Sequence, residues 1–376
     1  MKKILITYAT YGNGHKAIAE YIANYLKDEE YDIKLLNIMD YTGFLCNTTL
    51  KAFNFVYNHR LEHLFSFFYQ TADNNLNVKL YNFLFKKVIY NKKIKRAFID
   101  YNPDLVISSH FYGNNAAYNL IKSGLIDSKI ITIITDYAYH KFWTSNNDPD
   151  EIFVVANEIV KKDMIEKKVK SKHIYPYGLP FDIMKYNNVA PKEKLLKKYN
   201  ISSNKKVILF FMGGGNGSTA YLKYYKALAK MELKNTEIIV VCGKNEDIKE
   251  TVEDIKYKYK RKNIHVLGFV NNVYELLKIS DLVISKPGGA TVTECLETKN
   301  VMLVLPGIGG QENYNAKFIC KNNYGIRVRF LFTFKRALLK LINNEKEYNK
   351  LKNSYNKVNE NDPLEKISEL IKKTLK

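Results

Sequence analysis

A histidine closes a glycine-rich turn near the start of the chain. The segment Tyr8-Ala-Thr-Tyr-Gly-Asn-Gly-His15 follows a short apolar run, and its glycines allow a tight turn and close approach to a ligand. A helix that starts at about Lys16 would point free amide groups and its positive dipole end at such a ligand. His15 can take a proton from a substrate hydroxyl. We therefore predict His15 to be a general base, with a structural cap as the alternative for a histidine considered alone.

Two further glycine-rich loops lie in the second half of the chain. Met212-Gly-Gly-Gly-Asn-Gly-Ser218 is an open backbone loop suited to packing against phosphates, or simply a flexible turn. Ser285-Lys-Pro-Gly-Gly-Ala-Thr-Val-Thr-Glu294 ends a strand, turns and opens a helix whose first amides can hold a diphosphate. Glu294 lies about one turn further in, where a carboxylate can accept two hydrogen bonds from a ribose diol. The motif has no P-loop lysine, so it indicates a nucleotide-sugar site rather than phosphoryl transfer.

A fourth loop, Pro306-Gly-Ile-Gly-Gly-Gln-Glu-Asn-Tyr-Asn315, comes after the next apolar run. Gln311 and Glu312 stand at its junction with a helix, where they are suited to binding sugar hydroxyls. Polar groups there would distinguish hydroxyl stereochemistry, because a buried polar group without a partner is costly.

Short apolar strands separated by helical stretches must position these loops. In the first half we expect strands at 3–8, 33–38, 105–109, 130–135 and 152–156. In the second half we expect them at 207–212, 237–242, 264–267, 282–285 and 302–305. Continuous apolar strands that alternate with helices indicate parallel sheets covered on both faces. Two such series predict an α/β protein with two doubly wound domains.

The predicted boundary lies in the proline-containing stretch 176–204. We assign residues 1–187 to the first domain and 188–361 to the second, and we expect a last helix over 362–376, which the family resemblance described below implies packs back on the first domain. Residues 44–98 interrupt the alternation with many aromatic side chains and, from Lys79 to Arg96, seven Lys or Arg and no acid. This composition suits contact with an anionic membrane surface; two core helices with a solvated face are the alternative.

Composition narrows the class of protein further. The net charge of +21 fits nucleic acid, an anionic membrane or an anionic substrate. No nucleic-acid-binding module is recognisable, so a nucleic-acid partner is not expected. The four cysteines and seven histidines show no metal-ligand spacing. No apolar run is long enough to span a bilayer and the start reads as a strand, so we expect a cytoplasmic protein.

The motifs occur in an order that resembles glycosyltransferase family 28. The ordered set is the Gly-x-Gly-His turn, Thr135-Asp-Tyr-x-x-His140, the triple glycine, Gly268-Phe-Val270, the Lys286–Glu294 segment and Gly-Gln-Glu-x-x-Asn. Within the family the chain looks most like monogalactosyldiacylglycerol synthases and processive diacylglycerol glucosyltransferases, and more distantly like the transferase that forms lipid II. Two features depart from the pattern: Gly310 replaces a usual proline, and Ile-Arg-Val-Arg-Phe330 follows Gly325 in place of small residues.

The resemblance implies a GT-B fold, in which two Rossmann-like domains face each other across a cleft. It assigns His15 and Asp136 to catalysis, and Gly14 and His140 to the acceptor side. The residues it implies for UDP-sugar binding are Gly214, Gly215, Phe269, Val270, Gly289, Ala290, Thr291, Glu294, Gln311 and Glu312. It also implies that no metal or other cofactor is required.

The expected reaction is inverting transfer of a hexose from a UDP-sugar to a membrane lipid, with 1,2-diacylglycerol as the leading acceptor. A transferase or an epimerase that uses UDP-N-acetylglucosamine on the same fold is the alternative. A lipid acceptor stays in the bilayer, so we expect the protein to be peripheral on the inner face of the cell membrane and to contact anionic lipid through residues 44–98.

Overall fold

The computed structural model describes residues 1–10, 13–41, 91–146, 148–213, 215, 217–307, 309–358 and 362–376. The chain divides into two compact units. Unit 1 comprises Met1–Phe181, Ile308–Tyr314 and Asn361–Lys376, and unit 2 comprises Asp182–Gly307 and Asn315–Glu360. Most of the basic aromatic segment predicted to contact a membrane, residues 42–90, lies outside the described residues.

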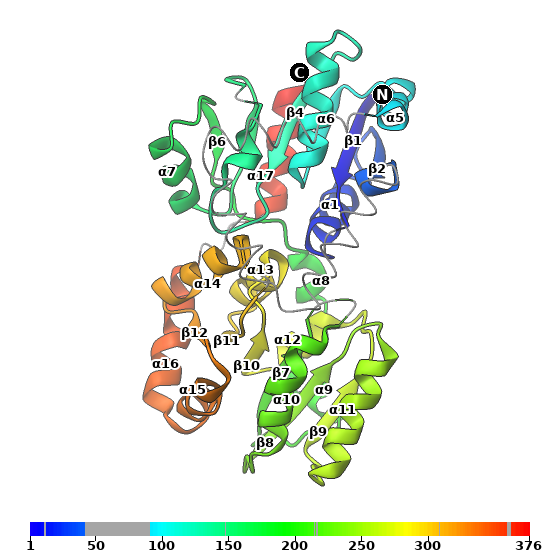
Figure 1. Cartoon of the computed structure of the whole chain (residues 1–376). Coiled ribbons are helices and arrows are strands. Elements are labelled where there is room, and N and C mark those ends of the chain that lie inside the picture. Colours follow the sequence, from blue (N-terminus) through cyan, green and yellow to red (C-terminus); the bar gives the residue numbers. More distant parts are fainter. Residues whose placement is uncertain are drawn as a thin grey trace. The chain divides into compact units, whose positions relative to one another are not determined.

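Unit 1 is built on a six-stranded parallel sheet with the strand order β2-β1-β3-β4-β5-β6. The strands are β1 (Lys2–Tyr8), β2 (Tyr31–Asn37), β3 (Leu105–Ser108), β4 (Lys129–Ile133), β5 (Ile152–Val154) and β6 (His173–Tyr175). The helices described around them are α1 (Asn13–Tyr25), α5 (Lys92–Tyr101), α6 (Phe111–Lys122), α7 (Glu158–Glu166) and α17 (Pro363–Leu375), with short 3-10 turns η1 (Ile38–Tyr41) and η2 (Lys141–Thr144) (Figure 1).

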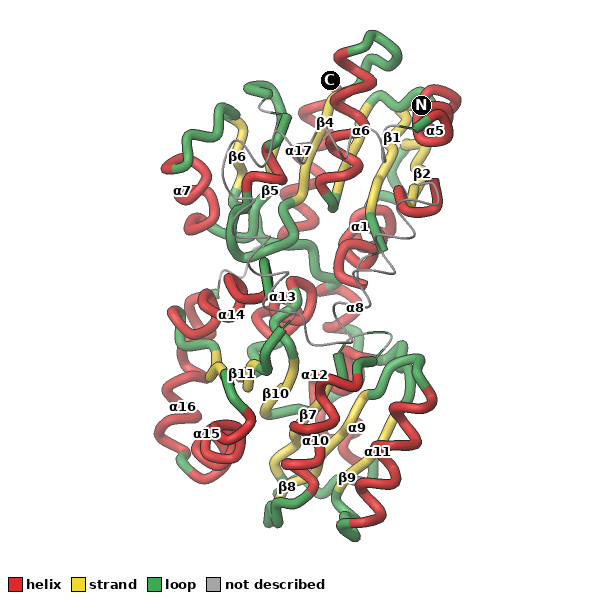
Figure 2. The backbone as a smooth tube through the Cα atoms, viewed as in Figure 1, coloured by secondary structure: helices red, strands yellow, loops and turns green. Residues whose placement is uncertain are grey.

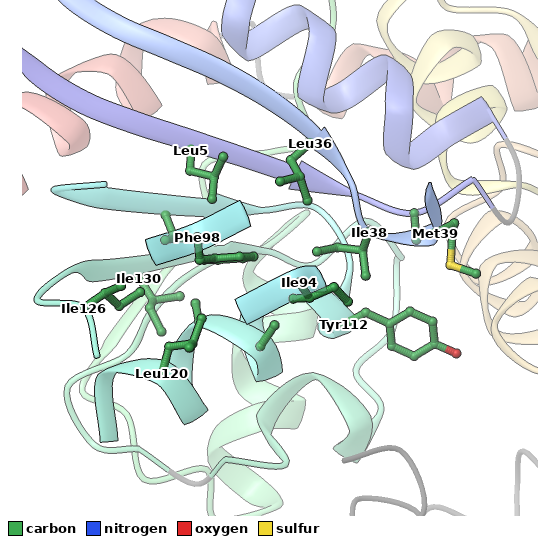
Figure 3. Close-up of a cluster of buried hydrophobic side chains, with 14 residues drawn as sticks. Leu5, Leu36, Ile38, Met39, Ile94, Phe98, Tyr112, Leu120, Ile126 and Ile130 are labelled. Atoms are coloured by element: carbon green, nitrogen blue, oxygen red, sulfur yellow. The ribbon is translucent and has the colours of Figure 1, made fainter. Parts of the chain in front are cut away.

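One face of this sheet is covered by α5 and α6. Figure 3 shows Leu5 of β1 and Leu36 of β2 turned toward Phe98 and Ile94 of α5. All four side chains are at most 2% exposed, and Leu120 of α6 completes the same cluster. Because every position of β3 is buried, and all but its last residue, Ser108, are apolar, the sheet is covered on both faces, as the continuous apolar runs predicted.

The last helix of the chain belongs to unit 1. Helix α17 contacts α1, and Lys372 Nζ donates to Glu29 Oε1 at 2.5 Å. The first residue of α17, Pro363, packs against Gly178, where an added Cβ would lie 3.0 Å from the proline ring. Asp362 caps the helix by accepting from Leu364 N at 2.8 Å.

Unit 2 contains a second six-stranded parallel sheet, in the order β12-β11-β10-β7-β8-β9 (Figure 2). Its strands are β7 (Lys206–Phe211), β8 (Thr236–Val241), β9 (Ile264–Leu267), β10 (Leu282–Ser285), β11 (Val301–Val304) and β12 (Gly325–Arg327). Its helices and turns are α8 (Ile183–Asn187), α9 (Lys192–Lys198), η3 (Thr219–Tyr221), α10 (Leu222–Ala229), α11 (Glu246–Lys258), α12 (Val273–Ile279), α13 (Gly289–Glu297), α15 (Leu331–Asn343), α16 (Glu345–Ser354) and η4 (Tyr355–Lys357). Helix α14 (Gln311–Lys321) belongs to unit 2 from Asn315 onward, and its first four residues fall in unit 1.

The prediction of two doubly wound α/β domains is confirmed, and all ten expected strands are present. Each sheet also has a sixth strand that the sequence analysis missed, β6 in unit 1 and β12 in unit 2. Both are three-residue edge strands, and such short runs carry too little apolar pattern to be recognised. Strand β12 and the start of α15 occupy the stretch after Gly325 where the sequence departs from the family pattern.

Candidate active site

The topology of unit 1 gathers three strand ends at one place. Strands β1, β3 and β4 are neighbours in the sheet, and the chain reverses its direction of winding between β1 and β3. In open parallel sheets, ligands bind outside the carboxyl ends of the strands at such a switch point. His15 follows β1, Ser109 follows β3 and Thr135 follows β4, so the three residues meet there although they are far apart in sequence.

The ring of His15 is held by two of these neighbours. Its Nδ1 lies 2.8 Å from the carbonyl oxygen of Ser109 and 3.0 Å from Thr135 Oγ1. The carbonyl can only accept, so Nδ1 carries the hydrogen and donates it. Nε2 then bears the lone pair that a general base needs. Ser109 also fixes the backbone of His15, because its Oγ donates to the His15 carbonyl at 2.9 Å.

Burial keeps His15 neutral. It lowers the pKa of His15 to about 4, and the hydrogen bond to Ser109 opposes this only in part. The imidazole is therefore in its basic form across the neutral range. A lower pKa makes His15 a weaker base. However, the ring is already neutral, so it can accept a proton without first losing one.

A second histidine, His110, packs edge-on against His15. Their ring centroids are 4.8 Å apart at an interplanar angle of 83°. Burial, and then the proximity of His15, hold the pKa of His110 well below its usual value. Its Nδ1 accepts from Tyr112 N at 3.2 Å and caps α6. Neither Ser109 nor His110 was predicted as a site residue, although Ser109 ends an expected strand and His110 follows it, where the switch-point rule points.

Asp136 and His140 follow the same strand, β4. Asp136 is 8% exposed and adjoins Thr135, which contacts the His15 ring. His140 is almost fully buried and caps the turn η2, because its Nδ1 accepts from Phe142 N at 3.2 Å. The fold therefore gives His140 a clear structural role in shaping the loop that begins with Asp136.

A buried polar network anchors the far end of that loop. Glu151 Oε1 accepts from Thr132 Oγ1 at 2.7 Å and from the side-chain amide of Asn114. Asn114 also donates to the Trp143 carbonyl at 3.3 Å and accepts from Asn146. Among the described residues, Glu151 Oε2 has no partner, and burial raises the pKa of Glu151 to about 8. No motif in the sequence had marked this carboxyl.

In unit 2 the switch point lies between β7 and β10. The glycine loop after β7 is closed by Ser218 N, which donates to the Met212 carbonyl at 2.6 Å. Gly213 and Gly217 both have positive φ, +101° and +69°. A Cβ on Gly217 would lie 2.3 Å from the Cys242 carbonyl oxygen, so this loop needs glycine. Gly214 lies outside the described residues, and the neighbouring Gly215 accepts from Lys244 N at 2.9 Å.

The loop after β10 leads directly into α13. Its N-cap is Gly288, which provides no side-chain hydrogen bond to the first amides of the helix. Gly289, Ala290 and Thr291 form the first turn, and each is only half-buried. Uncapped amides at a helix start favour an anionic ligand. Glu294 is also half-buried and lies further along α13, where burial raises its pKa to about 7.

Hydrogen bonds join the strand-end loops of unit 2. Tyr221 OH, beyond the glycine loop, donates to the Pro306 carbonyl after β11 at 3.1 Å. Asn315 Nδ2 of α14 donates to the Pro287 carbonyl after β10 at 3.0 Å. These bonds join the loops after β7, β10 and β11 into one edge of the sheet.

The remaining residues predicted to bind the UDP-sugar lie at the start of a helix or just after a strand. Gln311 and the buried Glu312 start α14, after Gly309 and Gly310, which both have positive φ. Phe269 and Val270 follow β9; Phe269 is exposed, and Lys244 Nζ lies 4.9 Å from its ring centroid.

The described residues contain neither a metal-binding cluster nor a membrane-spanning helix. No group of three or more His, Cys, Asp or Glu there is arranged to hold a metal ion. No helix in the same part of the chain has the length and apolar character to cross a membrane.

Together, the paired sheets and glycine-rich switch points define a GT-B-type α/β protein. The crystal structure of a glycosyltransferase from Rickettsia africae ESF-5 is similar, with a TM-score of 0.57 and 19% identity over 100% of this chain and 99% of that one. A UDP-GlcNAc 2-epimerase from Neisseria meningitidis is similar with a TM-score of 0.63 and 14% identity, over 99% and 100% of the two chains. At these identities the likeness establishes the fold alone.

Sequence comparison gives the family. The monogalactosyldiacylglycerol (MGDG) synthase model matches residues 15–181, and the glycosyltransferase family 28 C-terminal domain model matches residues 208–372. A curated relative, the processive diacylglycerol beta-glucosyltransferase of Bacillus pumilus (strain SAFR-032), is 29% identical over 338 residues, which are 87% of this chain and 82% of the relative. The two models together cover most of the chain, which belongs to glycosyltransferase family 28 and is a glycosyltransferase.

Proposed function

We propose that this glycosyltransferase moves a hexose from a UDP-sugar to the free hydroxyl of diacylglycerol, with inversion at the anomeric carbon. The observation that carries the proposal is the fixed tautomer of His15, whose Nδ1 is held by the Ser109 carbonyl at a topological switch point. A family relative that is named a processive diacylglycerol beta-glucosyltransferase supports glucose as the sugar and diacylglycerol as the acceptor.

The nucleotide part of the donor is proposed to bind unit 2. Its diphosphate would accept hydrogen bonds from the uncapped amides of Gly289, Ala290 and Thr291, and from the glycine loop that includes Gly214 and Gly215. Glu294 would accept from the ribose diol. Phe269 and Val270 would lie along the uracil, and Gln311 and Glu312 would bind the hexose. Amides at a helix start also stabilise the charge that develops on the leaving UDP, so the mechanism requires no metal.

The acceptor would be activated in unit 1. The hydroxyl of diacylglycerol attacks the anomeric carbon on the face opposite UDP, and His15 Nε2 takes its proton. The C–O bond to the diphosphate breaks as the new glycosidic bond forms. Since UDP-glucose carries its glucose in the α configuration, one displacement gives a β-glucoside, in agreement with the name of the relative. Asp136, next to the His15 pocket, is the second candidate for the base.

Diacylglycerol remains in a bilayer, so the enzyme is proposed to act as a peripheral protein on the cytoplasmic face of the cell membrane. The basic aromatic segment of residues 44–98 suits contact with anionic lipid. Its described end, α5, buries Ile94 and Phe98 and leaves Lys92, Lys93 and Arg96 exposed.

The test is a product assay. The protein is incubated with vesicles of phosphatidylcholine, phosphatidylglycerol and diacylglycerol, and with UDP-glucose, UDP-galactose or UDP-N-acetylglucosamine in separate reactions. We expect a monohexosyl or longer glycolipid by mass spectrometry, with β linkage by NMR, and a rate unchanged by EDTA. Epimerised or released sugar without any lipid product would contradict lipid transfer.

A further inference from the structure

Three consecutive large apolar side chains are exposed at the start of α15. Phe330, Leu331 and Phe332 are 58%, 41% and 79% exposed, and the rings of Phe330 and Phe332 stack with centroids 5.4 Å apart. In the part of the chain that the structure describes, no other exposed large hydrophobic residues form a run of three. Contiguous exposed apolar surface of this kind marks an interaction site.

This run is not needed to hold the helix in place. Helix α15 packs into unit 2 through Phe334, Leu338 and Leu341, which are all buried. The ring centroids of Phe334 and of Tyr224 on α10 are 5.6 Å apart. Its N-cap is Phe330, which makes no side-chain cap hydrogen bond. Ser, Thr, Asp or Asn at this position would add about 1 kcal/mol, so the exposed aromatic is kept at a cost to local stability.

Positive charge surrounds the exposed run. Arg329, Lys335 and Arg336 are exposed, and within the described residues none of them forms an ion pair. From 313 to 344 the chain has no Asp or Glu, and its basic residues are Lys317, Lys321, Arg327, Arg329, Lys335, Arg336 and Lys340. We call the residues Arg329, Phe330, Leu331, Phe332, Lys335 and Arg336 the α15 patch.

The α15 patch emerges at the ligand-binding edge of its sheet. Strand β12 lies beside β11, with Arg327 opposite Val304, and Val328 N donates to the Val304 carbonyl at 2.8 Å. Because the strands are parallel, the patch and the loop after β11 leave the sheet at the same edge. That loop leads to Gln311 and Glu312, the residues proposed to bind the transferred hexose.

We propose that the α15 patch docks unit 2 on a bilayer that contains anionic lipid. Phe330, Leu331 and Phe332 enter the interfacial region, while Arg329, Lys335 and Arg336 lie against lipid phosphates. Charge complementarity selects this partner, because the patch has several unpaired cations and no nearby acid in its sequence. The inference rests on the proposed lipid acceptor and adds a membrane contact in the domain that binds the donor, separate from residues 44–98.

The first test measures vesicle binding without any sugar or acceptor. Sedimentation with phosphatidylcholine vesicles that contain about one third phosphatidylglycerol gives the partition coefficient of the full chain. We expect Phe330→Ser/Phe332→Ser to lower it at least about tenfold, since two aromatic side chains lose apolar burial. Arg329→Gln/Lys335→Gln/Arg336→Gln should lower it by a similar factor and weaken its salt dependence.

Matched controls lie on the opposite edge of the same unit. Tyr257 on α11 is 87% exposed, so Tyr257→Ser removes an equally accessible aromatic ring. Lys258→Gln/Lys262→Gln removes charge from two exposed lysines. Both controls should bind vesicles within about twofold of the unaltered chain, because they leave the α15 patch intact.

A second measurement reports insertion directly. The chain has a single tryptophan, Trp143, which is buried, so Phe332→Trp adds an indole whose fluorescence should be quenched by brominated acyl chains. Unchanged partition of the Phe330/Phe332 variant, or no added quenching, would overturn the proposal. So would a dimer of the unaltered chain that the Phe330/Phe332 variant abolishes while vesicle binding stays the same.

These outcomes can be separated from the fate of the proposed function. UDP binding and turnover of a detergent-dispersed short-chain diacylglycerol should be unchanged in the α15 patch variants. If the chain transferred no hexose but the variants lost vesicle binding, docking would stand and the proposed reaction would fail. If transfer occurred and vesicle binding did not depend on the patch, only the docking proposal would fail.

Discussion

The two switch points of this chain are built from different kinds of chemical group. In unit 1 the candidate site is made of side chains: the His15 ring is fixed by Ser109 and Thr135, and His110 packs against it. In unit 2 the site is made mainly of backbone: a glycine loop, an uncapped helix start and one carboxyl, Glu294. Moving a proton requires a titratable group in a defined tautomer, whereas holding an anion requires only amides that point the same way.

The comparison predicts the largest loss at the side-chain site. His15→Ala should lower kcat by about 100-fold or more, because it removes the group that accepts the acceptor's proton. UDP affinity by calorimetry should stay unchanged, since the donor is proposed to bind unit 2. His173→Ala, at an exposed histidine on β6, is the control and should retain full activity.

The pH profile adds a second measure of the same residue. Because burial lowers the pKa of His15 to about 4, its base form persists well below pH 6.5. Activity should therefore show no acid limb near the ordinary histidine pKa, and a fall at pH values close to 4 is expected instead. Near-normal turnover of His15→Ala would remove His15 as the base and direct attention to Asp136.

The backbone site should respond to loss of one amide and not to addition of a small side chain at the same residue. Gly289 is the first residue of α13, a position that accepts proline. The preceding Gly288 has φ −67° and ψ 145°, an extended conformation that is compatible with a proline at the next position. Gly289→Pro should weaken UDP binding by about thirtyfold, or about 2 kcal/mol, the value of a charge-assisted hydrogen bond.

Gly289→Ala is the matched control, because it adds a Cβ and keeps the amide. Circular dichroism should show the same helix content in both variants. Equal UDP affinity of the two variants would mean that the amide of residue 289 does not contact the diphosphate. The proposed contrast between a side-chain site and a backbone site would then be wrong for this residue.

The Glu294 carboxyl, proposed to bind the ribose, should matter less, and its effect on UDP binding should depend on pH. Glu294→Gln should weaken UDP binding about tenfold at pH 8, where Glu294 is ionised and can accept from both ribose hydroxyls. Burial raises the pKa of Glu294 to about 7, so at pH 6 most of the carboxyl is already protonated. The difference between variant and wild type should therefore shrink as the pH falls from 8 to 6.

Comparing the two proteins at each pH cancels the titration of the UDP phosphate itself. Glu297→Gln, one turn further along α13, makes the same charge change and should leave affinity and its pH dependence as they are. A constant difference between Glu294→Gln and wild type from pH 6 to 8 would show that the carboxyl is not the titrating ligand.

The difference between the two sites also explains what the sequence revealed. Glycine-rich loops can be identified from composition alone, so the turns before His15 and after Met212 were predicted directly from the sequence. Ser109, His110 and Glu151 have ordinary surroundings in sequence, and only the strand order brings the first two beside His15. Residue type and position made His15 the candidate base, but the hydrogen bond that fixes its tautomer joins residues 94 positions apart.

The buried network around Glu151 could support the loop after β4 either as an ionised carboxylate or as a neutral acid. Glu151 holds Asn114 and Thr132, and Asn114 in turn ties down the loop that follows Asp136. Burial raises the pKa of Glu151 from 4.5 to about 8. Between these values the folded state keeps a proton that the unfolded state loses, so this group's contribution to stability declines as the pH rises from about 4.5 to 8.

Glu151→Gln mimics the protonated acid and removes that decline. The variant should match the wild type near pH 5 and melt higher at pH 8, by about 2–4 °C for each kcal/mol recovered. Glu151→Ala should lose the same pH dependence but melt lower throughout, since Thr132 and Asn114 lose their acceptor. If the apparent Tm of Glu151→Gln and wild type differed equally at both pH values, Glu151 would be ionised in the folded protein. The network would then contain a buried charge, whereas the His15 ring is neutral.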